Sequence, residues 1–211
     1  MLTIIDSGIA NIASVLNACR RIGAAANVAR EANVVLAASG LILPGVGTYA
    51  DGMDSLRRFG LVHPIRDAAS ADIPILGICL GMQLLADEGE EFGRHTGLGL
   101  LPGRTVELKP AVPEGRVPNM GWCLVHISAP GQGLFKTLGA EESFYFAHSF
   151  HLVCAEPADV VAVMPWGDGE VVAAVRRGNV HGVQFHPEKS QDAGLDVLHA
   201  FWMAVKERME G

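Results

Sequence analysis

Short runs of apolar residues alternate with stretches of helical periodicity along the first 90 residues. Residues 12–22 place apolar side chains at offsets of 0, 3, 4, 7 and 10, and Gly23 follows where a helix C-cap belongs. Further helical patterns run through Tyr49, Met53 and Leu56 and over Leu80–Ala86. The apolar runs predict strands at Leu2–Ile5, Asn27–Ala29, Leu41–Leu43 and Pro74–Ile78. This alternation predicts a parallel sheet with helices on its faces.

The second half of the chain is dominated by strand patterns. We expect strands at Thr105–Leu108, Trp122–Ile127, Ser143–Phe150, Val160–Val163, Val171–Val175 and Val180–Phe185. Arg177-Gly178-Asn179 is a hairpin turn signal, which favours antiparallel strands at a sheet edge or in a small second sheet. A helix closes the chain at 195–209, and 110–118 is the longest expected loop.

The fold class that follows is α/β. We expect one domain over residues 1–211, with a central mixed, mostly parallel sheet, flanking helices and an antiparallel extension. Hydrophobic residues make up 49% and charged residues 18% of the chain, which excludes intrinsic disorder.

Charge and cysteine content narrow the function classes. A net charge of −7 without a basic cluster argues against binding to nucleic acid or to an anionic membrane surface. The first residues lack a basic region and reach Asp6 almost at once, so we expect no signal peptide, and no apolar run approaches membrane-spanning length. The four cysteines are scattered, without the spacing of a disulfide framework or a zinc site. We therefore expect a reduced, cytoplasmic protein with no metal and no cofactor.

Cys79 stands where an expected strand turns directly into an expected helix, in Gly77-Ile78-Cys79-Leu80-Gly81. Such a corner strains the backbone, and small residues two positions on either side let the neighbouring elements pack closely. The free N–H groups and the dipole of the helix N-terminus favour a thiolate and the oxyanion that its attack creates. A cysteine between two glycines is equally compatible with simple burial.

His186-Pro187-Glu188 follows another apolar strand. Side chains at i and i+2 of an extended chain share a face, so Glu188 could orient His186 and His186 could take the proton of a thiol. A histidine at a strand end is more often only hydrogen-bonded, but its occurrence together with the elbow at Cys79 favours a Cys-His-Glu triad.

Pro44-Gly45-Val46-Gly47 ends a third expected parallel strand. Ligands of open α/β sheets bind beyond the carboxyl ends of the strands. Glycines there let a backbone N–H turn inward, as an oxyanion hole requires. By itself this segment would be an ordinary strand-to-helix turn.

Together these residues resemble the class I (triad-type) glutamine amidotransferases. The match rests on residues 77–85, Gly-Ile-Cys-Leu-Gly-Met-Gln-Leu-Leu, and on residues 184–188, Gln-Phe-His-Pro-Glu. Further matching segments are Asp6–Val15, Pro44–Gly47, Pro118–Trp122 and Tyr145–Phe150, so the resemblance runs along the whole chain. Within the family the set is most similar to glutaminase subunits that serve histidine biosynthesis.

The resemblance implies a role for each matching position. Cys79 would attack the side-chain amide of L-glutamine, His186 would act as base and acid, and Glu188 would orient it. The oxyanion would rest on N–H groups of Leu80 and of the loop containing Val46 and Gly47, with Val46 contributing after a peptide flip. The glutamine pocket would be formed by Gly45, Gln83, Glu91, Tyr145, His148, Ser149 and Phe150. The carboxylate of Glu91 suits the substrate ammonium.

The resemblance also implies a partner. Ammonia would pass through a channel to a (β/α)8 barrel cyclase subunit, in a heterodimer that makes imidazole glycerol phosphate and aminoimidazole carboxamide ribotide. Positions matching that interface are Asn11, Asn119, Met120, Trp122 and Lys189.

Two positions depart from the family pattern. The family usually has histidine where this chain has Asn119, and asparagine where it has Cys123. Both fall in the segment expected to meet the partner, so a paralogue that feeds a surface-sugar amidotransferase, anthranilate synthase or another synthase stays an alternative. A redox-sensing or chaperone-like relative with an elbow cysteine is a third hypothesis, but it would have no use for His186-Pro187-Glu188 or Gln83.

Overall fold

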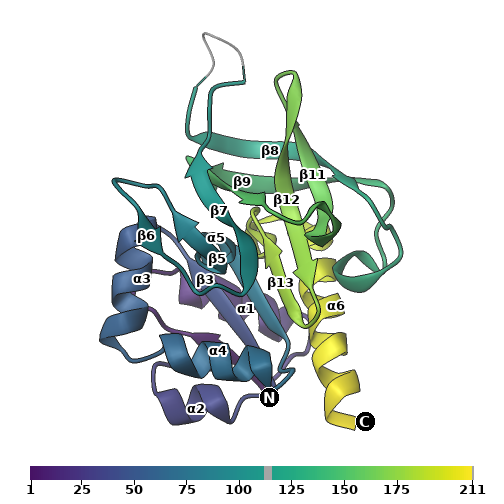
Figure 1. Ribbon diagram of the computed structural model, residues 1–211. Coiled ribbons are helices and arrows are strands. Elements are labelled where there is room, and N and C mark those ends of the chain that lie inside the picture. The colour runs from purple at the N-terminus through teal and green to yellow at the C-terminus, as the bar shows by residue number, and fades with distance from the viewer. Residues whose placement is uncertain (112–115, 211) are drawn as a thin grey trace.

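The computed structural model describes residues 1–111 and 116–210. Their centre is a nine-stranded sheet with the strand order β2-β1-β3-β4-β13-β12-β11-β8-β9 (Figure 1). Its parallel part consists of β1 (Leu2–Ile5), β2 (Ala26–Ala29), β3 (Gly40–Gly45), β4 (Ile75–Cys79) and β13 (Val180–Val183). The expected α/β domain with a mostly parallel centre is confirmed.

Antiparallel strands continue this sheet on one side, and a second, small sheet is mixed. The large sheet is extended by β12 (Gly169–Arg177), β11 (Val160–Trp166), β8 (Asn119–Ile127) and β9 (Glu141–His148). The small sheet has the order β10-β7-β5-β6, with β10 at Phe150–Cys154, β7 at Leu101–Glu107, β5 at Ala86–Gly89 and β6 at His95–Thr96. Its middle strands β7 and β5 pair in parallel, and its outer pairs are antiparallel. The expected antiparallel extension at the edge of the large sheet is therefore confirmed, and a small second sheet also occurs.

Helices cover both faces of the large sheet, because successive strand residues point in opposite directions. Ile4 packs in one core cluster with residues of α1 (Ile12–Arg21) and α6 (Gln191–Glu210), while Ile5 packs in the other with residues of α3 (Tyr49–Arg58) and α4 (Val62–Ser70). The remaining helical elements are α2 (Ala32–Leu36), α5 (Leu80–Leu84) and the single turns η1 (Gly133–Phe135), η2 (Pro157–Asp159) and η3 (Pro187–Lys189). Within the described residues, none of the helices has the length and apolar character needed to cross a membrane.

Four expectations need correction. The strand at 180–185 pairs with β12 in the expected antiparallel hairpin, but on its other side it pairs in parallel with β4, which was not expected. The helix after Cys79 ends at Leu84 and not at Ala86, because the carbonyls of Leu84 and Leu85 accept hydrogen bonds from residues 98–101. The helices α2 and α4 and the strands β5 and β6 were not expected. Residues 112–115 of the expected loop at 110–118 lie outside the described residues.

The fourth correction bears on the site. The strand expected at 143–150 is divided at Ser149 between the two sheets. His148 pairs with Asn119 in the large sheet, whereas Phe150 pairs with Glu107 in the small one. The chain therefore crosses from one sheet to the other within a single residue.

Candidate active site

The strained elbow predicted at Cys79 is present. Cys79 ends β4 and directly precedes α5, with φ +53° and ψ −112°. A left-handed conformation of this kind costs a non-glycine residue about 1–3 kcal/mol and persists only where the surroundings enforce it. Close packing enforces it: a Cβ at Gly77 would lie 2.7 Å from the Met82 backbone, and one at Gly81 would overlap the Leu43 carbonyl oxygen. Only glycine fits at either position.

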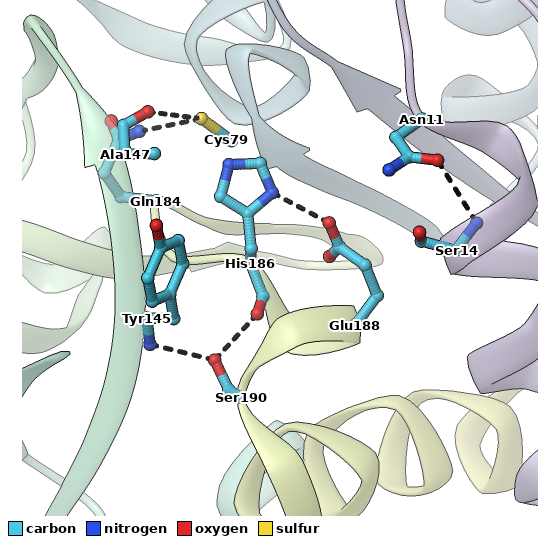
Figure 2. Close-up of polar contacts among 9 residues, drawn as sticks. All are labelled: Asn11, Ser14, Cys79, Tyr145, Ala147, Gln184, His186, Glu188 and Ser190. Carbon is cyan, nitrogen blue, oxygen red and sulfur yellow. Dashed lines mark hydrogen bonds and ion pairs between the residues drawn. The ribbon is translucent and has the colours of Figure 1, made fainter. Parts of the chain in front are cut away.

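His186 lies between Cys79 and Glu188 (Figure 2). Its Nδ1 atom is 2.8 Å from Oε1 of Glu188, and the two side chains are only 4% and 2% exposed. We expected the two residues to share one face of an extended strand. They instead contact each other through the single 3-10 turn η3, which brings the carboxylate back against the ring.

The surroundings of His186 favour its charged form. Burial alone would lower the pKa of the ring, but hydrogen bonds and charge interactions with Cys79 and Glu188 outweigh it and raise the pKa to about 9. The ring is therefore an imidazolium at neutral pH, flanked by a sulfur and a carboxylate. That arrangement matches the resting state of a cysteine nucleophile paired with a base.

Two further groups contact the Cys79 sulfur. Gln184 Nε2 donates to Sγ over 3.6 Å, and Sγ is 3.7 Å from the Ala147 carbonyl oxygen, to which a thiol would donate (Figure 2). Sequence reasoning quoted Gln184 in a motif but gave it no role, and it did not single out Ala147. A fully buried glutamine beside an apolar strand was the available signal for the first.

A cavity of about 200 Å³ lies against Cys79. Its lining residues are Val46, Gly47, Cys79, Leu80, Gln83, Glu91, Pro118, Met120, Ala147, His148, Ser149 and Phe150. Five of the seven expected pocket residues are among them. Gly45 instead packs in the sheet beside Cys79, and the Tyr145 ring contacts the edge of Trp122 with 6.3 Å between ring centroids. Pro118 was missed as a lining residue.

A larger groove of about 850 Å³ lies between the small sheet and the β11–β12 hairpin. Phe150 is the residue that it shares with the Cys79 cavity. None of its described lining residues is a cysteine, so the nucleophile Cys79 singles out the smaller cavity as the candidate active site.

The polar lining residues are held by protein contacts. Gln83 Nε2 donates to the Phe150 carbonyl over 2.7 Å and to Gln184 Oε1 over 3.0 Å. Glu91 Oε2 accepts from the Tyr49 backbone N–H over 2.6 Å, at the N-terminus of α3. Glu91 thus caps a helix as well as lining the cavity.

The loop after β3 presents its expected donor away from the cavity. The Val46 N–H donates to the Ile9 carbonyl over 2.9 Å, so this peptide must turn over before the group can face Cys79. Gly47 has φ +95°, a conformation that glycine adopts readily. Leu80 begins α5 directly beside Cys79.

The residues expected at the partner interface differ in their exposure to solvent. Met120 is 66% and Trp122 49% exposed. Lys189 is exposed, with its Nζ 5.7 Å from the centre of the Tyr145 ring, and Asn11 caps α1 by accepting from the Ser14 N–H. Asn119 does not belong with them, because it is only 7% exposed and its side chain contacts His148.

Ser190 is a supporting residue that sequence reasoning missed. Its Oγ donates to the His186 carbonyl over 2.7 Å and accepts from the Tyr145 N–H over 2.9 Å (Figure 2). It thereby fixes η3 to β9. Among the described residues there is no cluster of three His, Cys, Asp or Glu side chains that could hold a metal ion.

Residues 3–204 match the family model for class-I glutamine amidotransferases, and the chain belongs to this family. Its relatives include the imidazole glycerol phosphate synthase subunits HisH of Moorella thermoacetica and Synechococcus elongatus. The first is 43% identical, with 97% of this chain and 95% of the relative covered; the second is 40% identical, with 95% and 91% covered.

Solved structures agree on the fold. PurLQS from Thermotoga maritima superposes with a TM-score of 0.72 at 20% identity, covering 99% of this chain and 98% of that one. The glutaminase domain of CTPS from Trypanosoma brucei gives a TM-score of 0.70 at 18% identity, covering 98% and 93%.

Proposed function

We propose that the chain is the glutaminase subunit of an imidazole glycerol phosphate synthase, which hydrolyses L-glutamine and passes the ammonia to a partner subunit. The observation that carries the chemistry is the placement of Cys79 on a strained elbow, beside an imidazolium that Glu188 holds over 2.8 Å. Family membership and the 43% identity to a HisH subunit support the assignment to this synthase.

In the first half-reaction Cys79 is the nucleophile and His186 is the acid. The Cys79 thiolate attacks the carboxamide carbon of glutamine and forms a carbon–sulfur bond, while the carbonyl electrons move onto oxygen. That oxyanion is held by the N–H of Leu80 and, after its peptide turns from Ile9, by the N–H of Val46. Collapse of the intermediate breaks the carbon–nitrogen bond, and His186 gives its proton to the departing amine, which leaves as ammonia.

The second half-reaction regenerates the enzyme. Neutral His186 takes a proton from water, whose oxygen attacks the thioester carbon. The second tetrahedral intermediate expels the Cys79 thiolate and releases glutamate, leaving His186 protonated as at the start. Glu188 keeps the ring in one orientation throughout and stabilises its positive charge.

Substrate recognition falls to the cavity wall. Glu91 lines the cavity with a buried carboxylate, which suits the α-ammonium group of glutamine. Residues 147–150 also line the cavity.

The partner would be a (β/α)8 barrel cyclase that uses the ammonia to make imidazole glycerol phosphate. Met120, Trp122 and Leu124 form an exposed apolar row on β8, next to the cavity at Met120. Exposed aromatic and methionine side chains of this kind are enriched in protein interfaces. Docking at this row would place the barrel beside the site where ammonia forms.

The test is glutamate release from glutamine by the purified chain, alone and then with the cyclase and its ribonucleotide substrate. We expect little release by the chain alone and strong stimulation when both are added. Activity that ignores the cyclase would keep the glutaminase but overturn this choice of synthase. No activity with the cyclase present, while iodoacetamide still labels Cys79, would overturn the glutaminase itself.

A further inference from the structure

We infer that Asn119 is a positioning residue of the glutaminase site: it holds His148 in one neutral tautomer and thereby fixes the Phe150 carbonyl in the wall of the substrate cavity. The expected effect on glutamine kinetics rests on the proposed function, but the assignment of the His148 tautomer does not. It concerns one of the two positions at which this chain departs from the family pattern, and the structure places that residue inside the protein.

Every polar atom of the Asn119 side chain has a partner. Oδ1 accepts from the Cys123 thiol over 3.6 Å, and Nδ2 is 3.2 Å from His148 Nε2 and 3.5 Å from Met164 Sδ. A thioether sulfur can only accept, so the amide nitrogen must be the atom that faces it. Burial raises the pKa of the Cys123 thiol, which keeps that group a donor. The orientation of the amide is therefore determined by its surroundings.

The same reasoning determines the state of His148. Its Nδ1 atom lies 3.0 Å from the Phe150 carbonyl oxygen, which can only accept, so Nδ1 carries the proton. Its Nε2 atom faces the amide nitrogen of Asn119 and must accept. Burial lowers the pKa of His148 to about 4, and the nearby His151 and His186 also disfavour its charged form. His148 is thus a neutral ring with its proton on Nδ1.

The chain of contacts continues to the nucleophile. The Phe150 carbonyl also accepts from Gln83 Nε2, Gln83 Nε2 donates to Gln184 Oε1, and Gln184 Nε2 donates to the Cys79 sulfur. His148 and Phe150 both line the cavity, whereas Asn119 does not. Loss of the Asn119 donor would therefore act on the reaction through these residues and not through contact with the substrate.

The first experiment needs no substitution. Long-range proton–nitrogen NMR of the full wild-type chain, labelled on histidine, reports which ring nitrogen carries the proton. We expect His148 to be neutral with the proton on Nδ1 from pH 6 to 8. A proton on Nε2, or a charged ring at pH 7, would overturn the inference regardless of any activity.

Asn119→Asp then removes the donor with almost no change in shape. Its carboxylate cannot donate, so His148 would be flanked by two acceptors and would bind a second proton. We expect the pKa of His148 to rise by roughly 1–3 units. Asn27→Asp is the matched control: Asn27 lies on β2 at the opposite edge of the large sheet, and its Oδ1 accepts from Thr3 as a carboxylate also would. It should leave His148 unchanged.

Steady-state kinetics of the assembled enzyme complete the test. We expect Asn119→Asp to lower kcat/KM for glutamine roughly 5- to 20-fold, the range of one lost buried hydrogen bond, with most of the loss in KM. An unchanged KM together with an unchanged His148 would overturn the inference. If wild type shows the expected tautomer but no glutaminase activity with the cyclase, the proposed function fails while the assignment of His148 stands.

Discussion

The two sides of the cavity above Cys79 are built in different ways. On the nucleophile side, Cys79 is held at φ +53° by backbone packed against Gly77 and Gly81, and His186 and Glu188 are buried and in contact. At the end of the neighbouring strand β3, the Val46 side chain is exposed, and its N–H is engaged by Ile9 instead of facing the sulfur.

The nucleophile is thus already in place, whereas the Val46 N–H, which would stabilise the oxyanion formed by its attack, is not. Turning one peptide at the end of a strand takes less reorganisation than assembling a triad from two buried strands. A chain built this way keeps a ready nucleophile while withholding one oxyanion donor. Turnover then depends on whatever event turns the Val46 peptide, and contact with a partner at the neighbouring β8 is the event that we propose.

The largest effect is expected for Cys79→Ala. Glutamate release in the assembled enzyme should fall by roughly 10⁴- to 10⁶-fold, because the covalent route is lost. Alanine keeps the strained backbone at this position, whereas glycine adopts a positive φ without strain. The free energy of unfolding of Cys79→Gly should therefore be roughly 1 kcal/mol larger than that of Cys79→Ala. Urea denaturation measures the second difference. Equal stability of the two variants would mean that the elbow carries no strain.

Val46→Pro removes the backbone donor on the other side of the cavity. We expect kcat in the assembled enzyme to fall by roughly 10²- to 10³-fold, as for loss of one oxyanion donor. Cys79 should still react with iodoacetamide at a rate close to that of wild type, since the nucleophile is built independently. Val46→Ala retains the N–H and serves as the control. A matching loss of alkylation in Val46→Pro would contradict the separation of the two sides.

Gly81→Ala tests how the elbow is held. The added Cβ overlaps the Leu43 carbonyl oxygen, and we expect a loss of about 3 kcal/mol in the free energy of unfolding. The matched control is Gly139→Ala, where a Cβ meets nothing within 4 Å and stability should stay within about 0.5 kcal/mol of wild type. Chemical denaturation of both variants decides the point.

Trp122→Ala probes the surface that is proposed to receive the partner. It should weaken cyclase binding by about 2 kcal/mol, measured by titration calorimetry, as truncation of a central aromatic residue does. Leu36→Ala on α2 removes a side chain from a residue of similar exposure, 48% against 49%, and should leave binding unchanged. Equal effects of the two variants on binding would show that the exposed row on β8 is not part of the interface.

The last prediction concerns pH. Because the pKa of His186 is raised from 6.5 to about 9 in the folded chain, its charged form stabilises the fold fully below pH 6.5. That contribution is lost as pH rises through 9. The difference in unfolding free energy between wild type and His186→Gln should therefore shrink between pH 6.5 and 9. A constant difference would show that the ring is neutral throughout.

Much of the fold followed from the sequence because it depends on local periodicity. The apolar runs that became β1, β3 and β4 lie within two residues of their expected bounds. The parallel pairing of β13 was missed, because partner choice depends on contacts that are distant in sequence. The end of α5 at Leu84 was missed for a similar reason: residues 98–101 take its carbonyls.

The site divides in the same way. The elbow and the contact between His186 and Glu188 involve residues close in sequence, and the motifs revealed them. The position of Asn119 could not be obtained from its neighbours alone, because its side-chain nitrogen contacts His148 on β9 and Met164 on β11. The direction of the Val46 N–H depends on Ile9, which lies far away in the chain.

Because the chain crosses between the two sheets at Ser149, the cavity wall is sensitive to movement of one sheet relative to the other. His148 is bonded into one sheet and Phe150 into another, so where β9 continues into β10 a change in the angle between the two sheets falls on Ser149. Each sheet resists distortion within itself through its ladder of hydrogen bonds, whereas one residue has only two soft torsions. A force on the strands β8 and β9 would therefore act on the backbone torsions of Ser149, which lines the cavity.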